Sequence, residues 1–531
     1  MQRISALWKA IVIAFASSFC VMVIELVAAR ILAPHIGVSL YTWTSIIGVI
    51  LAGIALGNFV GGKVADRYPS PLLLTVIFFV GALLTVAILP ATRFVSEAGW
   101  FGGLPIMWHF VFQVALIFFL PAVVLSTVSP LVIKLTLGSL NRTGGVVGTI
   151  YACSTAGSIL GTFMTGFYFV LWFGTAATVW LVGAVLFLIG VLVWCAWEIP
   201  GRWRPTRNNL IAWAVIVVTL AASVLLYALR EDWQTGRNEA GEITEGTYTV
   251  TYATESNYFT IRVLESGNVK ALSLDRLIHS VYYPDQPPTT FFYPYLRTLE
   301  AVTGYLVQDN PAPRLLHLGG GGYSFPRYME YVYPDSINEV VEIDPLVTKV
   351  VHRYFGLAED TSIITYNQDG RLFFIQRHPE TKYDVVIGDV FSDRSTPYHL
   401  TTLEFDRLVR DSLNEGGVYL VHCIDIYGEG RYMPALVNTL QHAFGYVYIF
   451  GDLNGGEGAI HGSFVIAATD TPLDVAGYQA YLRESGLGLR YAPVAADKLE
   501  EYLAARDPIL LTDDYAPTDI LVAPIQPQYY K

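Results

Sequence analysis

Residues 315–344 read LLHLGGGGYSFPRYMEYVYPDSINEVVEID. A short apolar run ends in four glycines, Gly319, Gly320, Gly321 and Gly322, and a helix-capable segment follows. A second apolar run, 337–343, then closes on Glu342 and Asp344. This order predicts half of a nucleotide-binding βαβ unit, because glycines let a ligand approach the backbone at a helix N-terminus and an acid at the next strand tip can hold ribose hydroxyls.

The alternation of apolar runs and helix-capable segments continues beyond this stretch. Short alternating runs between residues 247 and 283 predict a small antiparallel sheet. From residue 290 the pattern becomes helix, strand, helix, strand, with strands predicted over 314–318, 339–343, 362–365, 384–388 and 417–422, and near 446–450 and 463–468. The C-terminal half is therefore predicted to be a Rossmann-like α/β domain preceded by a small β-subdomain.

Polar residues follow the predicted strands at the end where open parallel sheets bind ligands. Asp369 and Gly370 follow the third strand, and Asp389 follows the fourth. One strand-end acid alone is commonly a helix cap, and one glycine cluster alone is commonly a turn. Together with the glycine cluster and the acids at 342 and 344, these residues make four successive strand ends with such groups, which predicts one nucleoside ligand. Asp369 would accept a hydrogen bond from an adenine amino group, and Asp389 would lie at the centre of the cleft.

The first 229 residues have a different composition. Seven apolar runs reach the roughly 20 residues needed to cross a bilayer, and they cover 11–32, 41–60, 72–89, 107–128, 146–169, 176–197 and 210–229. The fourth contains Pro121 and Pro130, so it is either kinked, re-entrant or long enough to hide a further crossing. Gly53, Gly57 and Gly61 recur at four-residue spacing and predict close helix packing.

Four parts are expected from these patterns: a multi-pass transmembrane domain (1–229), a polar linker (230–246), a small antiparallel β-subdomain (247–289) and a Rossmann-like domain (290–531). Of the 45 acidic and 33 basic residues, only 4 and 11 precede residue 230, which leaves 41 acids against 22 bases. An acidic C-terminal half argues against nucleic acid as a partner and suits a cationic small substrate. The four cysteines have neither metal-ligand nor redox spacing, so we expect no metal.

The expected location is the plasma (inner) membrane, with the lipid bilayer as a partner of the first domain. Lys and Arg are concentrated at the N-terminus and in the even-numbered loops, which places the N-terminus in the cytoplasm. Seven crossings would then put the Rossmann-like domain outside. A nucleoside cofactor is made in the cytoplasm, so the side stays open.

Residues from about 255 to 522 resemble the spermidine synthase (polyamine aminopropyltransferase) family. The resemblance rests on the order and spacing of LGGGG (318–322), VVEID (340–344), DG (369–370) and YDVVIGD (383–389). The whole chain resembles the membrane-fused branch of that family, in which a strand-end aspartate precedes phenylalanine and serine, here Asp389, Phe391 and Ser392. The resemblance implies an AdoMet methyltransferase-like fold behind a small β-domain, and a homodimer is a further expectation.

The resemblance also implies a chemistry. Decarboxylated S-adenosylmethionine would give its aminopropyl group to a putrescine-like amine and leave as methylthioadenosine. An amine is nucleophilic only when neutral, so a carboxylate must take or hold its proton. Asp389 occupies the family's position for that catalytic base, and no metal is implied.

The chain departs from the family in the half that binds the amine. Gly322 stands where the family has an aspartate that binds the aminopropyl ammonium. The family's Asp-Ser-Ser-Asp becomes Asp389-Val390-Phe391-Ser392, with Asp393 one place late. Glycine at this position would leave room for the extra carboxylate of intact S-adenosylmethionine.

Two alternatives therefore stay open beside an aminopropyltransferase. One is an S-adenosylmethionine-dependent methyltransferase, or a related enzyme, acting on a membrane-borne acceptor. The other is a nucleoside-binding membrane sensor or carrier without catalysis, which would have no need for the base Asp389.

Several residues are candidates for an acceptor pocket, since aromatic faces attract ammonium groups and carboxylates pair with them. Packing, capping and turns are the alternatives for each. The candidates are Tyr258, Tyr293, Ser392, Asp393, His399 and Asp425, with Tyr295 and His279 as further aromatic neighbours. His317, inside a strand, is expected to be a core residue.

Overall fold

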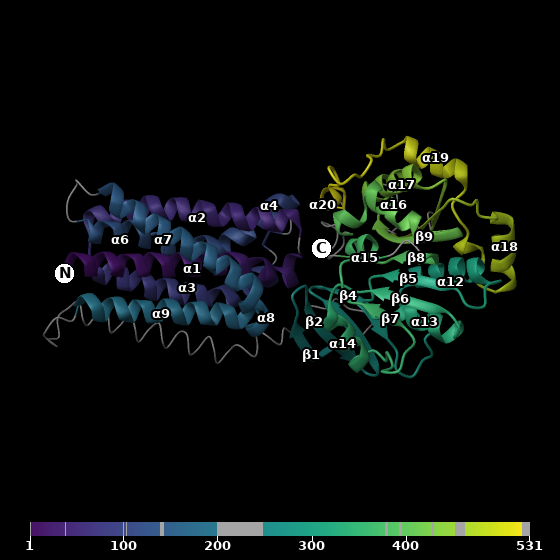
Figure 1. The fold of residues 1–531 in the computed structure, drawn as a ribbon, viewed down its shortest axis with the longest axis horizontal. Coiled ribbons are helices and arrows are strands. Elements are labelled where there is room, and N and C mark those ends of the chain that lie inside the picture. The colour runs from purple at the N-terminus through teal and green to yellow at the C-terminus, as the bar shows by residue number, and fades with distance from the viewer. Residues whose placement is uncertain are drawn as a thin grey trace. The chain divides into compact units, whose positions relative to one another are not determined.

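The computed structural model of this 531-residue chain describes residues 2–37, 39–98, 100–101, 104–137, 143–198, 248–377, 381–391, 396–426, 430–451 and 462–522. It contains two compact units, a helical one and an α/β one that follows it (Figure 1). The predicted fold class is confirmed.

Six helical stretches among the described residues are long and apolar enough to cross a membrane. They are formed by α1 (Gln2–Ile36), α2 (Leu40–Arg67), α3 (Pro71–Glu97), the α4–α6 series, α7 (Thr143–Met164) with η3 (Thr165–Phe169), and α9 (Thr175–Glu198), with the short α8 (Val170–Phe173) before α9. The seventh predicted span, 210–229, and the linker lie outside the described residues.

The fourth apolar run forms one span, so the idea of a further crossing hidden in it is wrong. α4 (Ile106–Val114), the π-helical turn η1 (Ala115–Phe119), α5 (Leu120–Ser126) and α6 (Val128–Thr136) follow one another within a single stretch, Met107–Thr136. Pro121 cannot donate a backbone hydrogen bond to the preceding turn. The π-helical turn lies where that bond would be missing, so the stretch stays helical.

Glycines on α2 and α7 allow backbones to approach closely. A Cβ at Gly57 would overlap the carbonyl oxygen of Val123 in α5, and one at Gly157 would overlap that of Phe15 in α1. Packing therefore accounts for the four-residue glycine spacing.

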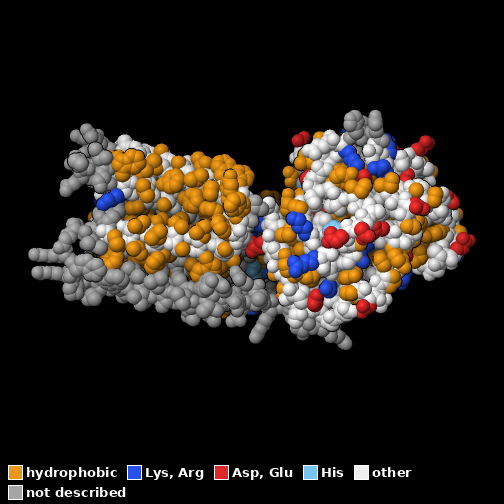
Figure 2. Space-filling model, turned by 60° about the horizontal axis from the view of Figure 1, so that its bottom comes forward, with side chains coloured by type: hydrophobic (Ala, Val, Ile, Leu, Met, Phe, Trp, Pro, Cys, Tyr) orange, Lys and Arg blue, Asp and Glu red, His pale blue; other side chains and the backbone are white. Residues whose placement is uncertain are grey.

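The outward surface of the helical unit is apolar. Figure 2 shows hydrophobic side chains over most of its visible face, whereas charged side chains are scattered over the α/β unit. Large apolar side chains on several helices are about half exposed or more, among them Leu51, Phe59, Ile159, Phe163 and Leu188. Such a surface fits a multi-pass membrane protein, because a bilayer solvates it and water does not.

The α/β unit contains one seven-stranded sheet. Its strands are β5 (Arg314–Leu318), β6 (Ile337–Val341), β7 (Ile364–Tyr366), β8 (Tyr383–Gly388), β9 (Leu413–Asp425), β10 (Tyr446–Phe450) and β11 (Gly462–Thr469). They lie in the order β10-β11-β9-β8-β5-β6-β7. β11 is antiparallel to both neighbours, whereas the pairs from β9 to β7 are parallel. The carboxyl ends of β5 to β9 therefore share one edge.

Helices cover both faces of this sheet, because successive strand residues point to opposite sides. Leu316 and Val386 face a core shared with α16 (Leu403–Asp411) and α17 (Tyr432–Ala443), and Leu315 faces the core on the other side. The remaining helices are α12 (Pro294–Val307), α13 (Ser324–Val332), α14 (Pro345–Tyr354), α15 (Gly370–Gln376), α18 (Val475–Glu484), α19 (Ala496–Ala504) and α20 (Thr518–Val522).

The predicted small sheet is also present. Its strands are β1 (Thr249–Glu255), β2 (Thr260–Ser266), β3 (Val269–Leu274) and β4 (Leu277–Tyr282), in sequential order. Ile261 and Leu272 pack in one core with Val340 of β6 and Val347 of α14. The last strand, β4, is thereby held beside the glycine loop.

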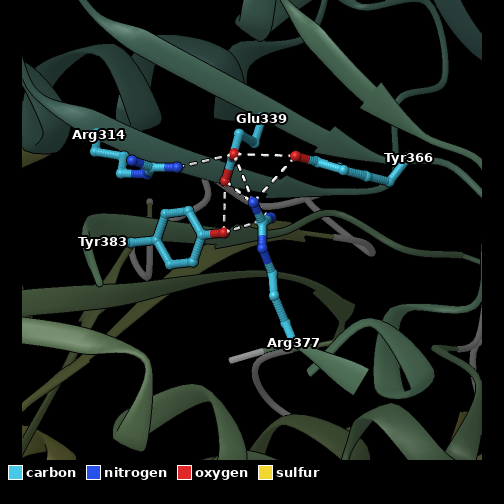
Figure 3. A network of polar contacts seen from close by, with 5 residues as sticks. All are labelled: Arg314, Glu339, Tyr366, Arg377 and Tyr383. Carbon is cyan, nitrogen blue, oxygen red and sulfur yellow. Dashed lines mark hydrogen bonds and ion pairs between the residues drawn. The ribbon is translucent and has the colours of Figure 1, made fainter. Parts of the chain in front are cut away.

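A buried ion network ties the parallel strands together (Figure 3). Glu339 of β6 is 1% exposed and accepts from Arg377 (2.9 Å) and Arg314 (3.0 Å), and from the hydroxyls of Tyr383 and Tyr366. Burial alone would raise the pKa of Glu339, but these donors hold it below its ordinary value. The network links β5, β6, β7, β8 and the residue that follows α15, so it fixes their relative positions.

Candidate active site

A cavity opens at the carboxyl ends of β5, β8 and β9, next to β4 and the start of α12. Its walls are largely aromatic and apolar, and one carboxylate lies among the described residues that line it. The polar and glycine residues of the wall are His279, Ser280, Tyr293, Tyr295, His317, Gly319, Gly320, Gly321, Gly322, Ser324, Asp389, His422 and Ser463.

The glycine loop forms one side of this cavity and needs its glycines. Gly319 has φ +87°, and a Cβ there would overlap the carbonyl oxygen of Asp389. Gly321 has φ +48° and no neighbour in its Cβ direction. Tyr323 follows in the left-handed region (φ 55°) and is fully buried, with its hydroxyl 3.1 Å from those of Thr348 and Thr365. The loop is thus anchored from behind, and Gly321 is the loop glycine that faces open space.

Glu342 lies behind the loop rather than in the cavity wall. Its carboxylate accepts from the backbone N–H of Gly320 (2.9 Å), Gly321 (3.1 Å) and Asp344 (3.0 Å). Burial raises the pKa of Glu342, against the effect of these three donors. Asp344 caps α14 by accepting from the backbone of Leu346. In this structure both acids hold the backbone, and neither lines the cavity as predicted for a ribose site.

Asp369 and His399 contact each other but do not line the cavity. Asp369 caps α15 by accepting from the backbone of Arg371 (2.9 Å) and Leu372 (3.0 Å), and its other oxygen lies 2.9 Å from His399 Nε2. Burial raises the pKa of Asp369, but these partners outweigh it and keep the pKa below its ordinary value. Gly370 is the first residue of α15. The helix-cap alternative is therefore the one that the structure displays.

Asp389 lines the cavity directly after β8. One carboxylate oxygen accepts from the hydroxyl of Tyr295 (2.7 Å), and the other lies 2.8 Å from His422 Nδ1. Burial raises the pKa of Asp389, but the charge and hydrogen bond of His422, the Tyr295 hydroxyl and His279 hold it below its ordinary value. Burial beside this carboxylate keeps the pKa of Tyr295 well above its usual range, so its hydroxyl is a donor. Asp389 is thus an ionised acceptor of two hydrogen bonds.

His422 belongs to the site, and sequence reasoning missed it. The next residue, Cys423, packs in the core beside α16 and α17, so His422 points to the other face of the sheet. β8 and β9 are parallel with Gly388 paired to Val421, so the next residues, Asp389 and His422, must lie side by side. That register is the signal that could have identified it.

Two other predicted acceptor residues differ in their surroundings. Tyr293 lines the cavity and donates to the carbonyl oxygen of Ile278 (2.6 Å); burial raises its pKa. Pro294 fills the first turn of α12, which fixes where Tyr293 enters the site. Tyr258 is 45% exposed and is not part of the cavity wall.

Asp425 does not face the cavity, contrary to its prediction as a substrate-binding residue. It is fully buried and accepts from the backbone of Ile426 (2.8 Å) and Met433 (2.7 Å) at the start of α17. Burial raises its pKa to about 6. Ser392 and Asp393 lie outside the described residues.

The space beside Gly322 is filled, which corrects the expectation that glycine leaves room there. A Cβ on Gly322 would overlap Oγ and Cβ of Ser280 in β4. Ser280 Oγ in turn lies 2.9 Å from Ser324 Oγ. A pair of hydroxyls therefore occupies the position at which the resemblance places an acidic side chain. His317, also in the wall, is bonded to Asn338 (3.2 Å), and burial lowers its pKa to about 4.

Known proteins resemble the α/β part of the chain, although no protein-family model matches it. The chain is 30% identical over 210 residues to a polyamine aminopropyltransferase of Vibrio vulnificus, covering 39% of this chain and 68% of that protein. It is 30% identical over 190 residues to a probable polyamine aminopropyl transferase of Bifidobacterium longum, covering 36% of this chain and only 40% of that protein.

A methyltransferase and a solved structure also match. The chain is 29% identical over 161 residues to an eEF1A lysine and N-terminal methyltransferase of Xenopus laevis, covering 28% of this chain and 23% of that protein. The crystal structure of a probable spermidine synthase from Corynebacterium glutamicum aligns with a TM-score of 0.44 and 22% identity, covering 49% of this chain and 96% of that one.

Proposed function

The chain belongs to the polyamine aminopropyltransferase (spermidine synthase) family, and from this premise we propose that it transfers an aminopropyl group from decarboxylated S-adenosylmethionine to a small amine, releasing methylthioadenosine. The observation that carries the proposal is Asp389. This ionised carboxylate lines an otherwise largely apolar cavity, next to the glycine loop that precedes α13. A cationic donor and an amine acceptor both require such a negative charge between aromatic walls.

The nucleoside would lie along the carboxyl ends of β5, β6 and β7. Gly319, Gly320, Gly321 and Gly322 would let it approach the backbone, as open glycine positions such as Gly321 allow. Glu342 would accept hydrogen bonds from the ribose hydroxyls only after releasing the backbone N–H groups of Gly320 and Gly321. Asp344 would hold the backbone at the end of the same strand. Asp369 with Gly370 would meet the adenine once His399 moves aside. These four roles are part of the proposal.

The acceptor would enter between Tyr293, Tyr295 and Phe391, which line the cavity together with Asp389. A putrescine-like primary amine fits this chemistry, because ring faces stabilise an ammonium and Asp389 balances its charge. Ser392 and Asp393 follow Phe391 in the chain and are proposed to contribute to the same pocket.

We further propose that the enzyme is a multi-pass protein of the plasma membrane, since six helices among the described residues are long and apolar enough to cross a bilayer. A homodimer belongs to the same proposal.

Methyl transfer from intact S-adenosylmethionine is the second candidate. A relative named as a lysine and N-terminal methyltransferase favours it. The absence of an acid at Gly322 favours it as well, because the family's ammonium partner is replaced by the hydroxyls of Ser280 and Ser324.

The nucleoside product separates these functions. Purified full-length protein in detergent is incubated with decarboxylated S-adenosylmethionine or with S-adenosylmethionine and a panel of amines. Methylthioadenosine together with an alkylated amine supports the proposal. Adenosylhomocysteine supports methyl transfer. Nucleoside binding without any product, unchanged in Asp389→Asn, would support a sensor or carrier.

A further inference from the structure

We propose that His422, oriented by Asp389, is the base that takes the proton from the acceptor amine; this inference rests on the proposed function. The family resemblance makes Asp389 the catalytic base. In this proposal His422 takes the proton instead, and Asp389 positions His422.

Both oxygens of Asp389 already accept strong hydrogen bonds. Oδ2 accepts from the Tyr295 hydroxyl at 2.7 Å, and Oδ1 faces His422 Nδ1 at 2.8 Å. Hydrogen bonds to the ionised form make a carboxylate a weaker base, and the pKa of Asp389 is accordingly below its ordinary value. Asp389 is therefore better suited to hold a cation than to remove a proton from an amine.

The other ring nitrogen of His422 is the free one. Because a carboxylate only accepts hydrogen bonds, Nδ1 must carry the hydrogen that it shares with Asp389. This leaves Nε2 with a lone pair when the ring is neutral. Nε2 is buried and has no hydrogen-bond partner in the part of the chain that the structure describes, although the ring lines the cavity. A buried polar atom without a partner calls for an explanation, such as a bound ligand.

The ring of His422 is held firmly in this orientation. It is 4% exposed, and it stacks on Tyr295 with centroids 3.7 Å apart and planes 6° apart. The ring of Phe391 meets it at 69°, with centroids 4.9 Å apart. A base must be positioned before it can act, and a neighbouring carboxylate stabilises the imidazolium that forms. Both conditions are met at His422.

The cavity contains a useful contrast in His317. That histidine is equally buried, but its Nε2 is bonded to Asn338, and burial lowers its pKa to about 4. The Nε2 atom of His317 therefore already has a hydrogen-bond partner within the core. The two histidines therefore differ in the property that matters, which is a nitrogen left for a substrate.

The titratable groups around His422 come from four elements. Asp389 follows β8, Tyr293 and Tyr295 lie at the start of α12, His279 belongs to β4, and His317 belongs to β5. The two tyrosines stay neutral because burial raises their pKa values. His317 is neutral above about pH 4. Among these described groups, Asp389 is the one in hydrogen-bond contact with the His422 ring.

The proposed step balances as follows. The amine enters as an ammonium, and Nε2 of neutral His422 takes one of its protons. The freed lone pair attacks the methylene carbon bonded to the sulfonium. The new C–N bond forms as the C–S bond breaks, and the electron pair of that bond stays on sulfur, which becomes a neutral thioether. The imidazolium, held by Asp389, then returns its proton to water.

The test follows methylthioadenosine release in a single turnover, from pH 5 to pH 9, with decarboxylated S-adenosylmethionine and the best amine of the panel. In the wild type the rate should fall as the pH is lowered, because a protonated base cannot take the proton of the amine. His422→Gln should lose about 100-fold or more and lose this acid limb, while nucleoside affinity stays within about threefold. Added imidazole should partly restore His422→Ala. His442→Gln, on the exposed face of α17, is the matched control and should behave as wild type.

A wild-type rate that is flat across this pH range would overturn the inference whatever the variants do. So would a His422→Gln protein that keeps the wild-type rate and acid limb while Asp389→Asn loses both, and in that case the proposed function stands with Asp389 as its base. If the wild type releases no methylthioadenosine with any amine, the function itself fails.

Discussion

The ring of Tyr295 lies flat on the ring of His422, with 3.7 Å between centroids and 6° between planes. The Tyr295 hydroxyl also reaches Asp389, which in turn contacts the same histidine. Three residues, from α12, β9 and the loop directly after β8, thus form one closed arrangement at the sheet edge. Each fixes the orientation of the other two, so conservative changes should act on rate more than on folding.

Tyr295→Phe separates the contribution of the Tyr295 hydroxyl from that of its ring stacking on His422. The ring remains on His422, but Asp389 loses one donor, and a hydrogen bond to a charged group contributes about 1.5–3 kcal/mol. We expect the transfer rate to fall about 10- to 100-fold and the melting temperature to fall by a few degrees. Tyr305→Phe, on the same helix, is the control, since its hydroxyl donates to the backbone carbonyl oxygen of Asp474 and Tyr305 does not line the cavity. Equal losses in both variants would show that the hydroxyl has no special role.

Gly322→Asp tests whether the acid that the resemblance leads one to expect can simply be restored. Its side chain would collide with Ser280, so we expect a loss of stability of about 1–3 kcal/mol from overpacking and no gain in nucleoside affinity. Ser280→Gly removes the colliding atoms, and the double variant should recover stability. The melting temperatures of Gly322→Asp and of the double variant show whether Ser280 causes the loss of stability. A fully stable Gly322→Asp protein would contradict the packing described here.

Glu339→Gln tests the network of Figure 3. The change leaves Arg314 and Arg377 beside a neutral amide, and removing one partner of a buried ion pair costs about 3 kcal/mol or more. Arg410→Gln is the control because its partner Asp470 is 47% exposed, and exposed pairs contribute about 1 kcal/mol or less. Thermal unfolding of the two proteins in the same detergent compares them. Similar losses would mean that the network does not hold the strands.

Asp425 predicts a pH dependence of stability. Its pKa is raised from 3.8 to about 6 in the folded protein. The unfolded chain therefore ionises first, so the stability present below pH 3.8 is lost as the pH rises through about 6. The difference in melting temperature between wild type and Asp425→Asn should be more favourable to wild type at pH 5 than at pH 7.5. A difference that moves the opposite way would disprove the assignment.

The succession of strands along the chain was predictable, because four of the parallel strands are followed by a glycine cluster or an acid. The bounds of β5 match the predicted ones, and the acids at 342, 369 and 389 all follow strands of one edge. The direction in which each side chain points was harder to predict from the sequence. A sequence does not show that the amides of Gly320 and Gly321 bind Glu342, or that His399 binds Asp369.

The residues missed or misplaced share one cause, which is contact across distant segments. His422 joins the site through strand register, 33 residues after Asp389. Asp425 sits three places further along the same strand yet turns to the start of α17. Ser280 fills the space at Gly322 from a different sheet. The local sequence pattern identifies residues that could take part in catalysis or binding. The pairing of strands and helices decides which of these residues contact one another.

The most direct measurement of the central claim follows the transferred carbons. Full-length protein receives decarboxylated S-adenosylmethionine labelled with carbon-13 in the aminopropyl group, together with putrescine and other primary amines, and the amines are analysed by mass spectrometry. We predict one labelled aminopropyl group on an amine for each methylthioadenosine released, and at least a hundredfold less in Asp389→Asn. Unlabelled amines in the wild type, or equal labelling in Asp389→Asn, would contradict the account.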